Sequence, residues 1–256
     1  MPVKDIVLNA VAAIFTQFNP EAAGQLLAPE YIQHNPAVPT GAAPILGFIP
    51  ALKDSGIVVT THRVIAEGDL VVLHNTYENA QLFGAETLVA FDVFRVEDGK
   101  LAEHWDNLQV PGAPNPSGRT MVDGETELRD LDKTAENKAL VSDFVRDVLQ
   151  GADPAKITEY VSTESYLQHN PQVADGLDGL GAALAAMAAA GMAMRYDETH
   201  LIVAEGNFVF TASEGAMGDA PTAFFDLFRV EDGKIVEHWD TIAEIPSEMA
   251  HENGKF

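Results

Sequence analysis

The chain has 256 residues, of which 46% are hydrophobic and 21% charged, so it is long enough for one large domain or two of ordinary size. Its formal charge of −24 argues against a nucleic-acid partner, because nucleic-acid binding depends on neutralising phosphates with Lys and Arg. The same charge argues against an anionic membrane surface. The absence of cysteine excludes disulfides, thiolate zinc sites and a cysteine nucleophile.

The chain shows no targeting or membrane segment. Residues 1–15 lack the basic start, compact apolar run and cleavage site of a secretion signal. The most apolar stretch, residues 179–194, is too short, too rich in Ala and Gly and too close to charges to cross a bilayer. We therefore expect a cytoplasmic protein without a membrane anchor.

The first half of the chain contains four predicted elements. Apolar residues recur at helical spacing from Ile6 to Phe18, which predicts an amphipathic helix. The segment YIQHNP at 31–36 follows, and because a residue before proline avoids helical geometry, we expect an extended loop there. Two hairpins are then predicted from apolar, β-branched runs around turn signals, HRVIAEGDLVVLHNTYE at 62–78 and FDVFRVEDGKLAEHWD at 91–106.

The same elements return in the second half. A helical pattern runs from Leu140 to Leu149, YLQHNP occupies 166–171, and HLIVAEGNFVFT at 200–211 matches 62–73. The segment FDLFRVEDGKIVEHWD at 225–240 is identical to its counterpart at 13 of 16 positions. A repeat of this length is a whole domain, and Pro, Gly, Asn and Ser mark a loop between the copies. We predict domains at 1–112 and 134–248, joined by a linker at 113–133; helices before antiparallel strands make the predicted fold class α+β.

The turn of the second hairpin decides which side chains share a face, because a one-residue shift of register moves every side chain to the other side of the sheet. A two-residue turn would place Asp92 opposite Trp105. We favour a three-residue loop, 97–99 with Gly99 left-handed, which places Asp92 opposite His104. This loop gathers on one face Asp92, Phe94, Val96, Ala102, His104 and Asp106 in the first copy, and Asp226, Phe228, His238 and Asp240 in the second.

Two carboxylates and an imidazole among apolar residues are what proton transfer requires. Desolvation raises the pKa of a carboxyl group, and a neighbouring carboxylate or imidazole separates the pair into an acid and a base. The same residues also fit an ordinary strand end, where Asp and His are solvated and pair with backbone groups. Because duplication copies structural residues as faithfully as catalytic ones, the repeat does not decide between these interpretations.

Other polar residues extend this candidate site. His34 and Asn35 precede Pro36, and they either bind a carbonyl at the mouth of the cavity or form a turn. His74 stands where the second copy has Ala212, which predicts a fuller site in the first copy. A metal site is an alternative, although no close-spaced ligand motif occurs. Its nitrogen and oxygen ligands would be His34, His74, His104, Asp92 and Asp106.

The sequence resembles a known family at these motifs. A helix, then Y-I-x-H-N-P, then a hairpin, then F-D-x-F-R-V-x-D-G-K-I-x-E-H-W-D resembles the SnoaL-like polyketide cyclase branch of the nuclear transport factor 2-like superfamily. The resemblance covers both halves and leaves out the linker and the C-terminal tail. It implies two tandem cone-shaped domains, each a curved antiparallel sheet closed by helices around an apolar pocket. It also implies cofactor-free acid/base chemistry on an enolisable ketone or ester, such as an aldol cyclisation.

The closing Asp of EHWD resembles the acid/base residue of that family, and the position fourteen residues earlier is turned into the pocket there. The predicted catalytic residues are therefore Asp106, Asp92, His104 and His34 in the first copy, and Asp240, Asp226, His238 and His169 in the second. The predicted substrate-binding residues are Tyr31, Asn35, His74, Phe94, Tyr166, Asn170 and Phe228. No metal ligand is assigned and no cofactor is expected.

The leading hypothesis is a cofactor-free lyase or isomerase that acts on a small apolar carbonyl compound. One alternative is a non-catalytic protein that binds an apolar small molecule, and another is a metal-assisted hydrolase that uses the His/Asp cluster. Subunits of single-domain relatives pair through their sheets, so the fusion implies an intramolecular pair and leaves room for a further homodimer. The side chains expected at that contact are Trp105, Trp239, Phe91 and Phe225.

Overall fold

The computed structural model describes residues 1–256 and divides into two compact units. The first unit comprises Met1–Val110 together with Pro246–Phe256, and the second comprises Pro111–Ile245. We call residues 111–133 the linker segment and residues 246–256 the C-terminal segment. The linker segment is thus part of the second unit, and the end of the chain is part of the first. No helix of the structure is long and apolar enough to cross a membrane.

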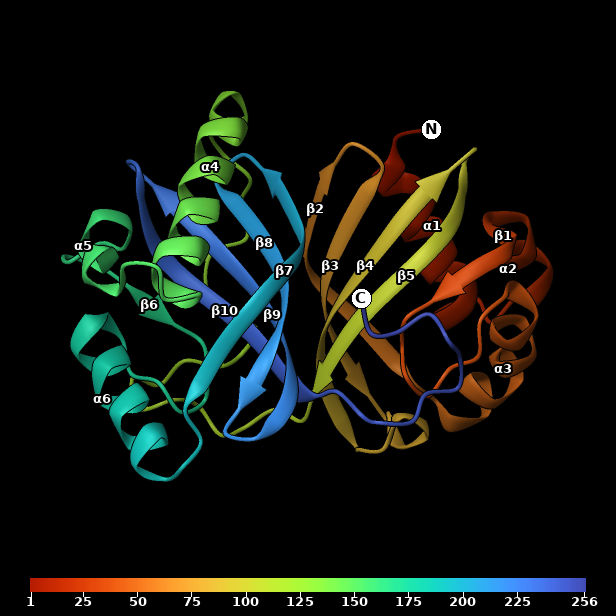
Figure 1. Cartoon of the computed structure of the whole chain (residues 1–256). Helices are drawn as coiled ribbons and strands as arrows, with labels where there is room; N and C mark the ends of the chain where they lie inside the picture. Colours follow the sequence, from red (N-terminus) through yellow and green to blue (C-terminus); the bar gives the residue numbers. More distant parts are fainter. The chain divides into compact units, whose positions relative to one another are not determined.

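The first unit is a five-stranded sheet with its helices on one face (Figure 1). The strand order is β1-β5-β4-β3-β2, with β1 parallel to β5 and every other pair antiparallel. Its elements are α1 (Val3–Phe15), α2 (Pro20–Leu26), β1 (Leu27–Gln33), α3 (Ala42–Ser55), β2 (Val58–Glu67), β3 (Leu70–Glu78), the short helical turn η1 (Gln81–Phe83), β4 (Thr87–Glu97) and β5 (Lys100–Gln109).

Local sequence explains where these helices begin and end. The predicted apolar stripe is buried from Ile6 to Ile14 and packs across β2 to β5, whereas Phe18 lies beyond the end of α1. The side chain of Asn19 accepts hydrogen bonds from the backbone at Glu21 and Ala22, which caps α2, and Pro20 occupies its first turn. Helix α3 ends at Gly56, whose φ of 69° is the left-handed geometry of a helix terminus. Buried aliphatic side chains such as Leu52 each stabilise the core by roughly 1.5–3 kcal/mol.

The second unit repeats this architecture with the strand order β6-β10-β9-β8-β7. Its elements are η2 (Leu131–Lys133), α4 (Thr134–Phe144), η3 (Val145–Leu149), η4 (Pro154–Lys156), α5 (Ile157–Tyr160), β6 (Leu167–Gln168), α6 (Gly176–Ala189), β7 (Met194–Glu205), β8 (Phe208–Met217), β9 (Ala220–Glu231) and β10 (Lys234–Glu244). Helix α6 buries none of its residues, whereas α3 buries Ile49 and Leu52. The predicted α+β class, with two tandem domains built on curved and mainly antiparallel sheets, is confirmed.

The β4–β5 hairpin corrects the predicted turn but keeps the predicted face. Its turn has two residues, Asp98 and Gly99, both with positive φ, and Glu97 pairs with Lys100. A bulge between Arg95 and Val96 then shifts the register, so that Asp92 lies opposite Asp106 and not opposite His104. Compared with the predicted hairpin, the turn has one residue fewer and the bulge adds one. The two changes cancel, so each side chain stays on the face of the sheet that we predicted for it, except at the bulge itself. The polar trio therefore shares a face, but Leu101 replaces Ala102 on the cavity side.

The YIQHNP segment is not the loop that we expected from its proline. Tyr31–Gln33 end strand β1, which pairs in parallel with β5, and the backbone N–H of His34 still donates to the carbonyl of His104. The second copy has the shorter strand β6, with Gln168 beside His238 and the N–H of His169 donating to the His238 carbonyl. In both units the motif therefore lies against the EHWD strand, within reach of its side chains.

Candidate active site

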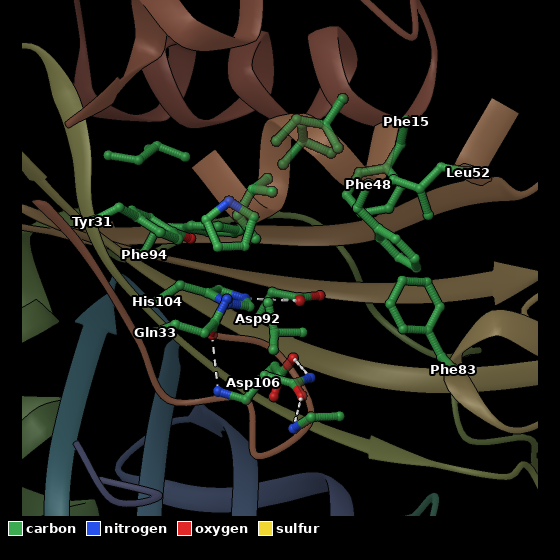
Figure 2. Close-up of a pocket in the computed structure, with 18 of the residues that line it drawn as sticks. Phe15, Tyr31, Gln33, Phe48, Leu52, Phe83, Asp92, Phe94, His104 and Asp106 are labelled. Carbon is green, nitrogen blue, oxygen red and sulfur yellow. Dashed lines mark hydrogen bonds and ion pairs between the residues drawn. The ribbon is translucent and has the colours of Figure 1, made fainter. Parts of the chain in front are cut away.

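The first unit encloses a cavity of about 200 Å³ between the sheet and helices α1 and α3. Figure 2 shows Phe48, Leu52 and Phe83 at one end of it, and Gln33 and His104 at the other. Most of the wall is aliphatic or aromatic. The polar side chains in the wall are Tyr31, Gln33, Asn35, Tyr77, Asp92, His104 and Asp106.

Asp92 is held by three side chains. His104 Nε2 lies 3.2 Å from its Oδ1, while Asn75 Nδ2 donates at 2.7 Å and Tyr77 Oη at 2.9 Å to its Oδ2. The carboxyl is 3% exposed, and buried carboxylates need such partners. Both oxygens of Asp92 are therefore occupied, and the group is fixed in place.

His104 is the middle member of a hydrogen-bond chain that runs from Gln33 to Asp92. Its ring stacks on Phe94 with centroids 4.6 Å apart, and its Nδ1 lies 2.9 Å from Gln33 Oε1. The same Oε1 accepts the backbone N–H of His34 at 3.0 Å and of Asn35 at 2.8 Å, so it is the amide oxygen and the ring Nδ1 donates to it. The contact between Nε2 and Asp92 then holds one proton, which resides on the ring or on the carboxyl.

Asp106 differs from Asp92 because one of its oxygens is left open. Asn35 Nδ2 donates to Oδ2 at 2.5 Å, whereas Oδ1 is buried and accepts no hydrogen bond. The residue is 4% exposed and lines the cavity. An open carboxylate oxygen in an apolar wall is placed to accept a proton from, or donate one to, a bound molecule.

The second unit contains the same trio. His238 Nε2 lies 2.9 Å from Asp226 Oδ1, and its Nδ1 lies 3.1 Å from Gln168 Oε1. Asn170 Nδ2 donates to Asp240, at 2.8 Å to Oδ2 and 3.1 Å to Oδ1. The hydrogen-bond chain of the first unit is therefore reproduced, except that both oxygens of Asp240 have a donor.

Burial and neighbouring charges shift the pKa values of Asp240 and His238 in this second trio. Burial raises the pKa of Asp240 to about 6, with the charge of His238 opposing the rise and the charge of Asp226 adding to it. Burial also lowers the pKa of His238, but the hydrogen bond to Asp226 and the charges of both carboxyls outweigh it, and the net pKa is raised. Asp240 is therefore a group that changes charge near neutral pH.

His34 and His169 do not lie at the cavity as predicted. Since Gln33 and Asn35 face the cavity, the alternation of an extended chain turns His34 to the opposite face of the sheet. There it stacks on Trp105 at 5.0 Å, with Nε2 2.9 Å from Glu103 Oε1. In the second unit the equivalent ring stacks on Trp239 at 4.7 Å and contacts Glu237 at 2.9 Å.

The other predicted residues divide in the same way. His74 stacks on Phe91 at 4.3 Å and its Nδ1 contacts Arg63 at 3.1 Å, so it lies on the face opposite the cavity. Phe228 stacks on His238 at 4.8 Å, and Tyr166 is buried in the core of the second unit. The cavity of the first unit receives Tyr31, Asn35, Phe94, Asp92, His104 and Asp106.

Sequence reasoning missed several groups that position these side chains. Gln33 and Gln168 orient the two histidines, and the repeat of YIQHNP as YLQHNP is a signal that could have identified them. Tyr77 and Tyr196 both reach the equivalent carboxyl, but from strands β3 and β7. Because these tyrosines are not aligned in the two copies, no pattern in the sequence marks them.

The hydrogen bonds also bear on the metal alternative. Donor atoms of Asp92, His104 and Asp106 lie within 4.8 Å of one another, as do those of Asp226, His238 and Asp240. A histidine ligand must turn a nitrogen lone pair to the ion. In His104, Nδ1 donates to Gln33 and Nε2 faces Asp92, so the ring is oriented for proton sharing.

Comparisons with known proteins find solved structures that are similar to parts of the chain. No curated protein matches it. Among solved structures, TsrD of Streptomyces laurentii is 25% identical, covering 42% of this chain and 87% of its own with a TM-score of 0.36. IdmH of Streptomyces antibioticus, provisionally described as a polyketide cyclase, is 17% identical over 43% of this chain and 93% of its own, with a TM-score of 0.36. A Kribbella flavida protein provisionally described as a ketosteroid isomerase is 20% identical over 49% and 90%, with a TM-score of 0.38.

The family comparison matches a larger part of the chain. The model of the SnoaL-like domain matches residues 8–104 and again residues 141–238. These two matches together span more than half of the chain and fall one in each compact unit. The chain therefore belongs to the SnoaL-like domain family and carries two copies of that domain.

Proposed function

We propose that the first unit is an acid–base enzyme of lyase or isomerase type, in which the chain's own side chains move a proton of a small apolar carbonyl compound. The observation that carries the proposal is the open oxygen of Asp106, which is buried, accepts no hydrogen bond and lies in the wall of an apolar cavity. Because no donor occupies this oxygen, it can approach the proton next to the carbonyl group of a bound molecule.

The remaining polar groups fit supporting roles in this chemistry. Asn35 holds the other oxygen of Asp106 and so fixes the direction of the open one. One ring nitrogen of His104 and one carboxylate oxygen of Asp92 lie within 4.8 Å of an oxygen of Asp106, so the proton that His104 and Asp92 share is available to the oxygen of an enolate. Proton removal and stabilisation of the developing charge are therefore assigned to neighbouring groups on one face of the sheet.

The cavity favours a small substrate. Its volume of about 200 Å³ lies below the roughly 300–1,000 Å³ that is typical of sites for drug-sized ligands. Phe15, Phe48 and Phe83 line it, and no Lys or Arg does. A compact ketone or ester matches this lining better than a charged metabolite.

Exchange of hydrogen for deuterium tests the proposal without knowledge of the natural substrate. Acetophenone and cyclohexanone in deuterated buffer are followed by NMR for loss of the proton next to the carbonyl. We expect the wild type to accelerate this exchange. The double variant Asp106→Asn, Asp240→Asn should exchange about 10²- to 10⁴-fold more slowly than the wild type. Because Asn keeps the shape of Asp, circular dichroism serves as the folding control. Equal exchange in wild type and double variant would sink the assignment.

A non-catalytic binding protein is the second candidate, and the largely apolar cavity favours it. It predicts that acetophenone binds without accelerated exchange and that affinity survives both Asn substitutions. Titration calorimetry measures the affinity of the same variants for acetophenone, and the exchange assay measures their catalysis. Affinity that survives in both Asn variants, with no accelerated exchange in the wild type, would favour the binding protein.

A further inference from the structure

The C-terminal segment is fastened to the motif that carries Gln33 and Asn35. Ala250 N–H donates to the Pro36 carbonyl at 2.8 Å, and Asn253 Nδ2 donates to the Gln33 carbonyl at 2.9 Å. His251 Nε2 lies 2.9 Å from the carbonyl of Asn35. Gly254 completes the attachment, because its carbonyl lies 2.9 Å from His34 Nδ1. These contacts place the last residues of the chain beside β5, where the C-terminus is labelled in Figure 1.

This attachment brings an ammonium group to Asp106. Lys255 is 7% exposed, and its Nζ donates to the backbone carbonyl of Asp106 at 2.5 Å. The same Nζ lies 3.7 Å from Asp106 Oδ1, the oxygen that accepts no hydrogen bond. Lysine is almost never fully buried unless it is paired, so this position needs a charged partner.

The charges around Lys255 identify that partner. Burial lowers the pKa of Lys255, and the carboxylates of Asp106 and Asp92 oppose this fall. The nearby imidazoles of His34 and His104 face Glu103 and Asp92, respectively. Asp106 is the acidic group in direct contact with the ammonium.

The second unit has the same attachment without the charge. There the linker segment takes the place of the C-terminal segment, with the Thr120 carbonyl 2.8 Å from His169 Nδ1. The residue that follows is Met121, which is buried, whereas Lys255 follows Gly254 in the first unit. The position that Lys255 has in the first unit is therefore occupied by an uncharged residue in the second unit.

We propose that Lys255 is a positioning residue of the first site, whose ammonium keeps Asp106 ionised and directs its open oxygen as the base of the reaction. The role of Asp106 as the base rests on the proposed function, but the pairing of Lys255 with Asp106 does not. The ammonium remains charged and transfers no proton. The two sites of the chain thereby differ, with an ammonium beside the outer carboxyl in the first and a carboxyl that changes charge near neutral pH in the second.

The pairing is tested by carbon-13 NMR titration of the Asp106 carboxyl in the full chain. We expect Lys255→Met, which copies the residue found in the second unit, to raise the titration midpoint by about 1 to 3 pH units, because an opposite charge at this distance favours the ionised form by that amount. Lys255→Arg should restore the wild-type midpoint. The midpoint of Asp240 in the same spectra should not move and serves as the control.

A reciprocal measurement covers the case in which Lys255→Met does not fold. In Asp106→Asn, the midpoint of the Lys255 side chain should fall by about 1 pH unit or more, because the burial penalty is no longer opposed. If neither midpoint moves in folded protein, Lys255 does not act on Asp106 and the inference is overturned.

Ketone exchange then separates this inference from the proposed function. At a pH where Asp106 is protonated in Lys255→Met but ionised in wild type, the exchange rate of the variant should be at least about tenfold lower than that of wild type. The rate of the variant should recover as the pH rises and its Asp106 ionises. Shifted NMR midpoints in a protein without any exchange activity would leave the pairing standing and refute the enzyme. Exchange that is active but has the same pH profile in both proteins would refute the role of Lys255.

Discussion

The two copies of the domain agree in their hydrogen-bond chain and differ in what surrounds it. In each, a glutamine oxygen accepts from a histidine whose other nitrogen faces a carboxyl, and a second carboxyl lies directly across the strand pair. The first copy adds Lys255 beside its second carboxyl, and the second copy has no equivalent. Duplication thus kept the geometry of proton sharing while allowing the charge at the outer carboxyl to change.

The tyrosines show how the same contact can be rebuilt from another strand. Tyr77 on β3 donates to Asp92, and the equivalent place on β8 is Gly215, since Leu70 and Phe208 both pair with the arginine of the hairpin. A side chain at Gly215 would collide with the carbonyl of Arg195 on the adjoining strand. The hydroxyl that reaches Asp226 comes instead from Tyr196, one residue along that same strand.

Helices α3 and α6 give the largest expected contrast in stability. Leu52 on α3 is 1% exposed, whereas Leu184 on α6 is 42% exposed. We expect Leu52→Ala to cost about 2–5 kcal/mol of unfolding free energy, because it removes buried apolar contacts and enlarges the cavity that Leu52 lines, and Leu184→Ala to change it by less than about 0.5 kcal/mol. Urea denaturation of the two variants measures both values. Similar losses would mean that α6 packs as tightly as α3.

Asp240 gives the next contrast, through the pH dependence of stability. Its pKa is raised from 3.8 to about 6 by burial, so the folded chain holds this proton more tightly than the unfolded chain. The resulting stability is fully present below pH 3.8 and is lost as the pH rises through 6. Asp240→Asn avoids this loss, and we expect it to be more stable than wild type by about 3 kcal/mol at pH 8.

Thermal unfolding at pH 4 and pH 8 checks this sign. The difference between Asp240→Asn and wild type should shrink to about 0.5 kcal/mol at pH 4, where the carboxyl is protonated in the folded chain and about half ionised in the unfolded chain. A variant that is less stable than wild type at pH 8 would show that the ionised carboxylate is stabilised by its surroundings, contrary to the burial argument.

The fold and the trio followed from the sequence because both depend on alternation and repetition. Side chains alternate between the two faces of a sheet with a period of two. The predicted turn of the β4–β5 hairpin was wrong by one residue, but the bulge shifts the register by one more residue, so Asp92, His104 and Asp106 share a face as predicted. The bulge itself left no mark in the sequence. It arises from how the strands pair, and the exchange of Ala102 for Leu101 in the cavity wall could not be foreseen.

Residues assigned to the site by motif alone were predicted less well. His34 stands out in YIQHNP, but the alternation of β1 turns its neighbours Gln33 and Asn35 to the cavity instead. We expected a loop before the proline and so applied no period to this segment. Lys255 lies far from the motif in sequence and reaches Asp106 only through the fold, so no local pattern could have indicated it.

The smallest contrast concerns Gln33 and Gln168, where we expect the two copies to behave alike. Gln33→Leu keeps the volume but removes the oxygen that accepts the Asn35 N–H and the His104 ring proton. Leaving these buried donors unpaired should cost about 1–3 kcal/mol of unfolding free energy.

Gln168→Leu removes the same oxygen from Asn170 and His238 and should cost a similar amount. Urea denaturation at pH 7 compares the two variants with wild type. Near-zero changes in both would mean that water replaces the amide oxygen in each unit. A loss in one copy alone would show that the hydrogen-bond chain is required in that copy and has become dispensable in the other, which would extend the divergence of the two sites from their outer carboxyls to their histidines.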